Sequence, residues 1–199
     1  MKKLIAVAIL GLTAVSGWAQ GTVDFRNGGI TFPTDNDRRV YLGSVPAVPG
    51  GGVPLTGTTW VAGLWYLPGA DKGAQIATAS QVGGRTFAFR PDTTALKGYW
   101  VAPAGVSPIF TFPDVAVGGA ATLQVRVWDS AKYNSYDAAV AGGQYGASAP
   151  FNYTVPAAGS TPDKYYMDNL RAFGVVPEPS TIALGLLGVA SLLFLRRRK

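Results

Sequence analysis

The sequence predicts an all-β fold, a β-sandwich or jelly-roll-like arrangement of about eight antiparallel strands between an N-terminal signal helix and a C-terminal transmembrane helix. Short runs rich in β-branched and aromatic residues alternate with clusters drawn from the 26 Gly and 14 Pro residues, a pattern typical of sandwiches and barrels. One run, residues 121–129, alternates regularly between two sets of side chains. The 48% hydrophobic content of the 199 residues is sufficient for one core.

Nine runs are candidate strands because each combines β-favouring residues with Gly, Pro, Asn or Asp at its ends. In chain order they are residues 22–26, 39–42, 58–67, 75–79, 86–89, 109–112, 121–129, 151–155 and 170–175.

The alternation in residues 121–129 assigns side chains to faces. Leu123, Val125 and Val127 share one parity and Trp128 belongs to the other. Successive side chains of a strand point to opposite faces. We therefore expect the three aliphatic side chains inside and Trp128 turned toward solvent or a partner.

Gly63 lies between Trp60 and Trp65 in the candidate strand 58–67. A glycine inside a strand often marks a bulge that changes which face the following side chains occupy. The faces of the two tryptophans therefore stay unassigned, and one of them is expected in the core.

One short helix is expected at residues 135–141, where an alanine-rich run has good helix propensity. Asn134 or Ser135 can cap its start. Gly142 and Gly143 can supply the left-handed residue that ends it.

The N-terminus has the three parts of a secretory signal. Lys2 and Lys3 precede an apolar stretch at residues 4–12, and Ala19 stands before Gln20. This order of charge, short apolar run and small residues predicts a signal peptide at residues 1–19 that signal peptidase removes between Ala19 and Gln20.

The C-terminus predicts a membrane anchor. Residues 179–195 carry no charge. The length of this run is at the short limit for a membrane-spanning helix. A basic cluster after an apolar run keeps the C-terminus in the cytoplasm and the preceding domain outside. The cluster here is Arg196, Arg197, Arg198 and Lys199.

Pro177, Glu178 and Pro179, followed by an apolar run and a terminal basic cluster, resemble the PEP-CTERM sorting signal of exported bacterial proteins. The resemblance implies that an exosortase, a membrane protease, recognises these three residues, and that the precursor is anchored in membrane lipid before it reaches the cell surface or the extracellular medium. It also implies a biofilm or exopolysaccharide context in Gram-negative bacteria. The predicted organisation is a signal peptide at 1–19, a β-sandwich ectodomain at 20–176 and the sorting signal at 177–199.

The composition excludes several chemistries. The chain contains no His and no Cys, so it cannot form a Ser-His-Asp triad, a thiolate or imidazole metal site, or a disulfide. Residues 20–176 contain no Glu and ten Asp, and most of these Asp residues stand in turn contexts. We therefore expect no enzyme activity and no cofactor, and a glycosidase with paired carboxylates is a less favoured alternative.

The charge and the acidic loops of the chain favour neither a nucleic-acid partner nor a metal site. Most of the net charge of +6 belongs to the two ends, so no nucleic-acid partner is expected. Asp35, Asn36 and Asp37 could contribute oxygen ligands to a calcium ion from one loop, and Asp168 and Asn169 lie elsewhere in the chain. A turn stabilised by Asx side chains is the favoured interpretation, and no metal site is predicted.

Exposed aromatic residues suggest one ligand site. Trp128, Tyr133 and Tyr136 could form a stacking platform for a sugar ring. The favoured alternative is that Trp128 packs beneath residues 135–141 in a small second core. The expected function is a structural or adhesive role outside the cell, and a carbohydrate-binding module for extracellular polysaccharide is the alternative.

Overall fold

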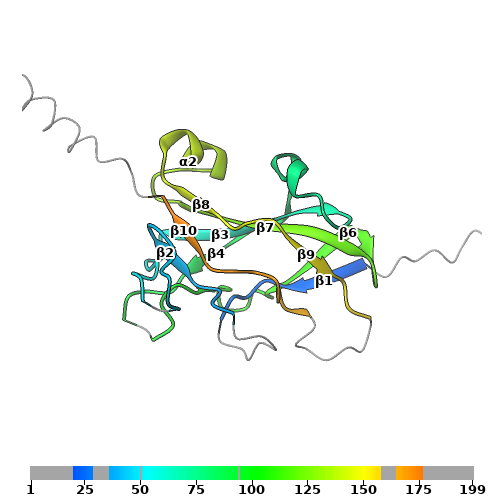
Figure 1. Ribbon diagram of the computed structural model, residues 1–199, viewed down its shortest axis with the longest axis horizontal. Helices are drawn as coiled ribbons and strands as arrows, with labels where there is room; N and C mark the ends of the chain where they lie inside the picture. The colour runs from blue at the N-terminus through cyan, green and yellow to red at the C-terminus, as the bar shows by residue number, and fades with distance from the viewer. Residues whose placement is uncertain (1–19, 29–35, 50, 94, 158–164, 177–199) are drawn as a thin grey trace, which may run out of the picture.

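The structure, a computed structural model, describes residues 20–28, 36–49, 51–93, 95–157 and 165–176 (Figure 1). Its elements are β1 (Gln20–Asp24), β2 (Val40–Leu42), β3 (Trp60–Pro68), the 3-10 helix η1 (Gly73–Thr78), β4 (Ser80–Phe89), β5 (Trp100–Val101), β6 (Ile109–Ala116), β7 (Ala120–Asp129), α2 (Tyr136–Gly142), β8 (Tyr145–Ala147), β9 (Phe151–Thr154) and β10 (Phe173–Val175). The described chain is all-β with two short helical segments.

The strands form two sheets. The larger has the order β2-β10-β8-β7-β3-β4-β5, with β9 also paired to β7, and the smaller pairs β1 with β6. The centre of the large sheet is a long antiparallel ladder in which all nine residues of β3 pair with β7. The two termini of the described chain leave at opposite ends of the molecule (Figure 1).

The number and direction of the strands differ from the prediction. The described residues contain ten strands, and β10 pairs with β2 in parallel. Residues 75–79 were predicted as a strand but lie largely in η1. β5 and β8 were not predicted, because two and three residues are too few to show periodicity in the sequence.

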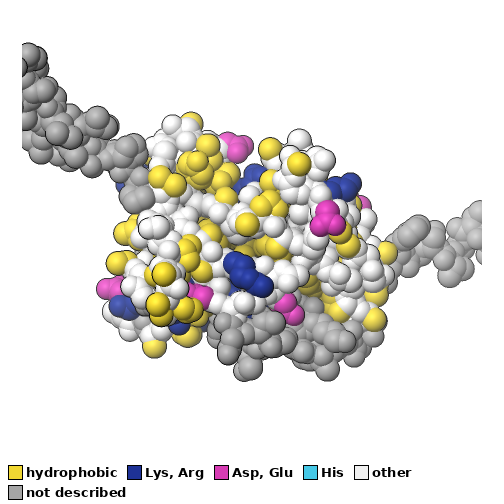
Figure 2. Space-filling view, viewed as in Figure 1, with side chains coloured by type: hydrophobic (Ala, Val, Ile, Leu, Met, Phe, Trp, Pro, Cys, Tyr) yellow, Lys and Arg dark blue, Asp and Glu magenta, His cyan; other side chains and the backbone are white. Residues whose placement is uncertain are grey.

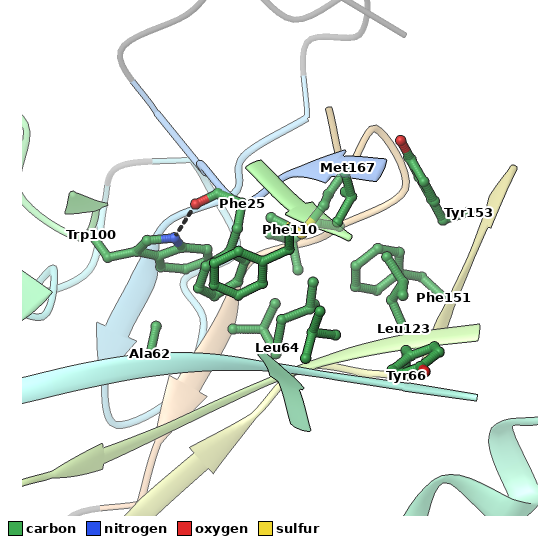
Figure 3. Packing of buried hydrophobic residues seen from close by; sticks show 14 of the residues in the cluster. Phe25, Ala62, Leu64, Tyr66, Trp100, Phe110, Leu123, Phe151, Tyr153 and Met167 are labelled. Carbon is green, nitrogen blue, oxygen red and sulfur yellow. Dashed lines mark hydrogen bonds between the residues drawn. The ribbon is translucent and has the colours of Figure 1, made fainter. Parts of the chain in front are cut away.

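One hydrophobic core lies between the two sheets (Figure 3). Phe25 lies 5.0 Å from Trp100 and 5.1 Å from Phe110 between ring centroids, and 5.4 Å from Phe87. The indole nitrogen of Trp100 donates to the carbonyl of Phe25 at 3.0 Å. Buried aromatic rings contribute large apolar area, and a buried indole N–H requires such an acceptor.

β7 confirms the predicted alternation. Leu123, Val125 and Val127 are fully buried in the main core. Trp128 lies on the opposite face, as its parity predicts, but it is only 6% exposed. The expectation that it faces solvent is wrong, because α2 and its neighbours cover that face of the sheet.

The irregularity near Gly63 lies on the neighbouring strand. The pairing of β3 with β7 is continuous through Gly63, whereas the register with β4 shifts between Gly63 and Trp65. In β4, Gly83 and Gly84 have φ values of 62° and 61°, which glycine adopts without steric cost. β3 therefore keeps its parity, and Trp65 faces the outer side of the sheet.

The margin of the large sheet at β2 is covered by its own chain. The N–H of Leu42 donates to the carbonyl of Val53 at 2.8 Å, and the N–H of Leu55 donates to that of Val40 at 2.8 Å. Such cover protects an edge strand from pairing with another chain.

Among the described residues, no helix has the length and apolar character needed to cross a membrane. The predicted signal helix and the predicted anchor lie outside these residues.

Candidate functional site

An open groove lies on the outer face of the large sheet, beside the N-terminal end of α2. It encloses about 510 Å³, within the usual range for small-ligand sites. β3, β4 and β7 provide its floor and one side, and the residues that lead into α2 provide the other. Its lining includes Trp65, Gln81, Trp128, Tyr133, Tyr136 and Asp137.

The aromatic side chains of the groove come together through strand pairing. Val61 pairs with Trp128 across β3 and β7, so Trp65, four residues after Val61, lies on the same face as Trp128. The rings of Trp65 and Trp128 are 6.1 Å apart in an edge-on arrangement. Tyr136 of α2 lies 5.8 Å from Trp65 and 6.2 Å from Trp128.

Gly63 provides space for this cluster. A Cβ atom at this position would lie 2.7 Å from a ring carbon of Trp65 and 3.0 Å from the amide nitrogen of Gln81. The indole of Trp65 therefore lies over the backbone at Gly63, edge-on to the ring of Trp128.

Arg126 supplies a buried positive charge beside two of the aromatic residues that line the groove. Its guanidinium lies 4.8 Å from the ring centre of Trp65 and 5.1 Å from that of Tyr136. It also donates to the side-chain oxygen of Gln124 and to the carbonyl of Ile76, both at 2.8 Å. Burial lowers the pKa of Arg126, and the aromatic faces and the two oxygen acceptors compensate part of the lost hydration.

α2 holds Tyr136 at the groove because both of its ends are capped. The hydroxyl of Ser135 accepts from the N–H of Ala138, and Gly143 adopts the left-handed conformation after the last turn. The predicted helix is confirmed, with Ser135 as its N-cap. Burial raises the pKa of Tyr136 to about 12, so its hydroxyl stays protonated at neutral pH and can donate or accept a hydrogen bond.

The structure brings Trp128, Tyr133 and Tyr136 into the lining of one groove. Trp128 packs with Val61, Trp65 and Ala139 in a second core, as the alternative interpretation expected. Tyr133 and Tyr136 are half-buried and reach the groove. Any stacking on a ligand would therefore fall to these two tyrosines.

Sequence reasoning did not assign Trp65 or Arg126 to this site. Arg126 stands two residues before Trp128 in β7, so equal parity already placed both on one face. Trp65 could not be assigned because the position of the bulge depends on β4, a distant part of the chain.

Two aspartates that were considered as calcium ligands, Asp37 and Asp168, have other partners in the structure. Asp37 accepts from the N–H of Arg39 at 3.0 Å and from the hydroxyl of Tyr41. Asp168 lies 4.0 Å from the guanidinium of Arg38. Asp35 lies outside the described residues. No group of three acidic, His or Cys side chains that could hold a metal occurs among the residues described.

Asp24 and Asp114 likewise have direct partners. Asp24 forms an ion pair with Arg26. Asp114 accepts from the hydroxyl of Tyr66 at 2.8 Å, and burial together with this bond raises the pKa of Tyr66 to about 12.

The chain leaves the large sheet immediately before the proline-containing tail. The carbonyl of Val175 accepts from the N–H of Gly43 at 2.9 Å, and the N–H of Val176 donates to the carbonyl of Tyr145 at 2.8 Å. Gln20 is the first residue of β1. The other terminal residues singled out above lie outside the described chain: Ala19, Pro177, Glu178, Pro179, Arg196, Arg197, Arg198 and Lys199.

Comparison with known proteins gives one match. Residues 175–199 match the family model of the PEP-CTERM protein-sorting motif. Neither the curated proteins nor the solved structures compared with the chain gave a match. The tail therefore identifies an exported protein that an exosortase sorts.

Proposed function

We propose that this chain, an exported protein that ends in a PEP-CTERM sorting motif, delivers a β-sandwich domain to the cell surface or the extracellular matrix, where the domain has a structural or adhesive role and no catalytic one. Residues 1–19 act as its signal peptide, and residues 177–199 anchor the precursor in the membrane until the exosortase cleaves it. The observation that carries this proposal is the sorting motif matched at residues 175–199.

The position of the motif supports release of an intact domain. β10 ends at Val175, and the last described hydrogen bond of the chain joins the N–H of Val176 to Tyr145. Cleavage after Val176 would remove no strand of the described fold. Pro177 and Pro179 have no backbone N–H and favour an extended chain, the conformation that proteases bind.

The absence of catalytic function is inferred from the available side chains. A chain without His or Cys has few nucleophile and base pairs. Several aspartates of the described domain are held by arginine or tyrosine partners.

The aromatic groove favours a second candidate, adhesion through extracellular polysaccharide. Sugar rings present an apolar face that stacks on aromatic side chains and hydroxyl groups that need polar partners. The groove offers both, with Tyr133 and Tyr136 beside Gln81 and Asp137. Because the groove is open to solvent, it suits a polysaccharide chain better than an enclosed small molecule.

The sorting proposal is tested by intact mass spectrometry of the protein from its native host, in membrane, surface and medium fractions. We expect extracellular molecules that begin at Gln20 and end near residues 177–179. A matched host that lacks the exosortase should retain Lys199 in the membrane fraction. An intact C-terminus outside the cell in the normal host would refute the proposal.

The adhesion candidate is tested by binding of the purified protein to the matrix polysaccharide of its host, with dextran as a comparison. Tyr136→Ala should reduce binding several-fold. Tyr165→Ala, which changes a half-buried tyrosine outside the groove lining, should leave it unchanged. Equal binding by both variants, with unchanged circular dichroism, would refute a role of the groove.

A further inference from the structure

Exposed apolar side chains gather where the chain leaves the sheet toward its tail. Nine large hydrophobic side chains are exposed among the described residues, and five of them belong to β2, the loop after it and the C-terminal end of the fold. We call these five the apolar rim: Leu42 at 47%, Val45 at 44%, Val48 at 69%, Val53 at 65% and Val176 at 50% exposure. Figure 2 shows hydrophobic side chains gathered at this end of the molecule.

Backbone pairing fixes the rim beside the exit of the tail. Leu42 pairs with Val175 across the parallel strands β2 and β10. The N–H of Gly43 donates to the carbonyl of Val175, and the N–H of Leu42 donates to that of Val53. The fold therefore holds Leu42 and Val53 close to Val176, and Val45 and Val48 lie on the loop that joins these two residues.

The chemistry of this region is unusual for a surface that faces only water. Residues 40–57, which include β2 and the loop after it, contain no charged side chain. Loops at a protein surface normally carry polar groups, whereas contiguous exposed apolar patches mark interaction surfaces. Pro46, Pro49 and Pro54 also remove three backbone donors from the loop, which lowers the cost of contact with an apolar phase.

The length of chain beyond the fold limits the distance between the rim and a membrane. The uncharged run that precedes the basic cluster includes Ile182, six residues after Val176. Six extended residues span at most about 20 Å. Part of this distance lies within the interfacial layer of the bilayer, which is roughly 5–7 Å thick on each side.

We propose that the apolar rim is a membrane-contact surface, which inserts shallowly into the lipid interface while the tail anchors the precursor. This inference rests on the membrane anchoring in the proposed function. The tail holds the rim at a high local concentration near lipid, so weak apolar contacts suffice. The contact would orient the domain with the β2 end toward the membrane and present residues 177–179 at the membrane surface.

A second copy of the chain is a less suitable occupant. The edge of β2 is already paired with residues 53–55 of the same chain, so strand addition is blocked there. At this end the chain continues into the predicted membrane anchor. The anchor would bring lipid close to the rim, and this favours lipid as the occupant.

A single cysteine provides a direct test, because the chain contains no native cysteine. Val48→Cys is labelled with an environment-sensitive NBD dye in the full chain. The protein is reconstituted in vesicles of phosphatidylethanolamine and phosphatidylglycerol that contain a nitroxide lipid as quencher. We expect a blue-shifted emission from position 48 that the nitroxide quenches several-fold.

Ala70→Cys is the matched control, because Ala70 is exposed at the other end of the sheet. Val176 lies at the same end of the sheet as the start of β3. It bonds to Tyr145, and Tyr145 pairs with Trp128. Trp128 pairs with Val61 near the start of β3. Ala70 lies beyond the end of the nine-residue β3, about 25–30 Å away along the strand. Its dye should show no quenching.

Four outcomes are informative. Quenching at position 48 alone supports the rim. Equal lack of quenching at both positions, in protein that floats with the vesicles, overturns the rim and leaves the anchor intact. Protein that does not float overturns the anchoring and the inference with it. Blue-shifted emission without quenching, together with a doubled mass in sedimentation, assigns the rim to a second copy and overturns the lipid contact.

Discussion

Removal of the Asn27 side chain should clearly lower the free energy of unfolding of the described domain. It is 1% exposed and joins three segments near the margins of the large sheet. Its amide nitrogen donates to the carbonyls of Arg38 at 2.9 Å and Gly98 at 3.1 Å. Its amide oxygen accepts from the N–H of Trp100 at 3.1 Å. Asn27→Ala would remove all three bonds.

The expected loss of unfolding free energy follows from the backbone groups that lose a hydrogen-bond partner in Asn27→Ala. The carbonyl of Gly98 keeps a second donor, the N–H of Val40 at 3.0 Å, whereas Arg38 and Trp100 lose the partner described here. A buried polar group without a partner costs about 1–3 kcal/mol, so two such groups cost roughly 2–6 kcal/mol. Because domains of this size lose about 2–4 °C in Tm per kcal/mol, we expect Tm to fall by roughly 10 °C.

Urea unfolding of the purified protein, followed by tryptophan fluorescence, measures this cost. Asn134→Ala is the control, because Asn134 is exposed in the loop before α2 and a surface substitution usually changes stability by less than about 0.5 kcal/mol. An Asn27→Ala loss below about 1 kcal/mol, or one equal to the control, would refute the view that this amide joins the sheet margins.

Three further predictions concern the groove and its surroundings. Ser135→Ala should cost about 1 kcal/mol of unfolding free energy through loss of the α2 cap, and polysaccharide binding should weaken in the same variant; an unchanged urea midpoint would contradict the capping bond. Gly63→Ala should displace the ring of Trp65, since a Cβ would lie 2.7 Å from it, and reduce the near-ultraviolet circular dichroism; an unchanged spectrum would contradict the packing. Burial raises the pKa of Tyr66 and Tyr136 to about 12, above the value of 10 in the unfolded chain. Their contribution to stability is therefore complete below pH 10 and is lost as pH rises from 10 to 12, which urea midpoints measured across this range will show or refute.

The sequence was most informative where local pattern and tertiary structure agree. β7 alternates over ten residues, so its faces were predictable. The run 75–79 contains only Ile76 as a large aliphatic. Most of this run lies in η1, where the carbonyl of Ile76 accepts from Arg126. Arg126 lies 50 residues further along the chain, so no local pattern in the sequence shows this contact.

β8 illustrates what the sequence could not supply. It has three residues with a glycine at its centre, a pattern that is typical of a loop. A Cβ on Gly146 would lie 2.9 Å from the carbonyl of Gly174, so the glycine is required by the close approach of β10. The same reasoning applies to the groove: its tyrosines were predictable as a group, but the floor formed by Trp65 depended on the register with β4.

The parallel pairing of β10 with β2 makes the large sheet depend on segments from both ends of the described chain. In the large sheet, the strand order gives β2 only β10 as a neighbouring strand. Phe173 pairs with Val40 across more than 130 residues of chain, so the sheet cannot be completed until β10 is available. β10 ends at Val175, the residue at which the match to the sorting motif begins. Completion of the sheet therefore requires the chain up to the start of the sorting motif.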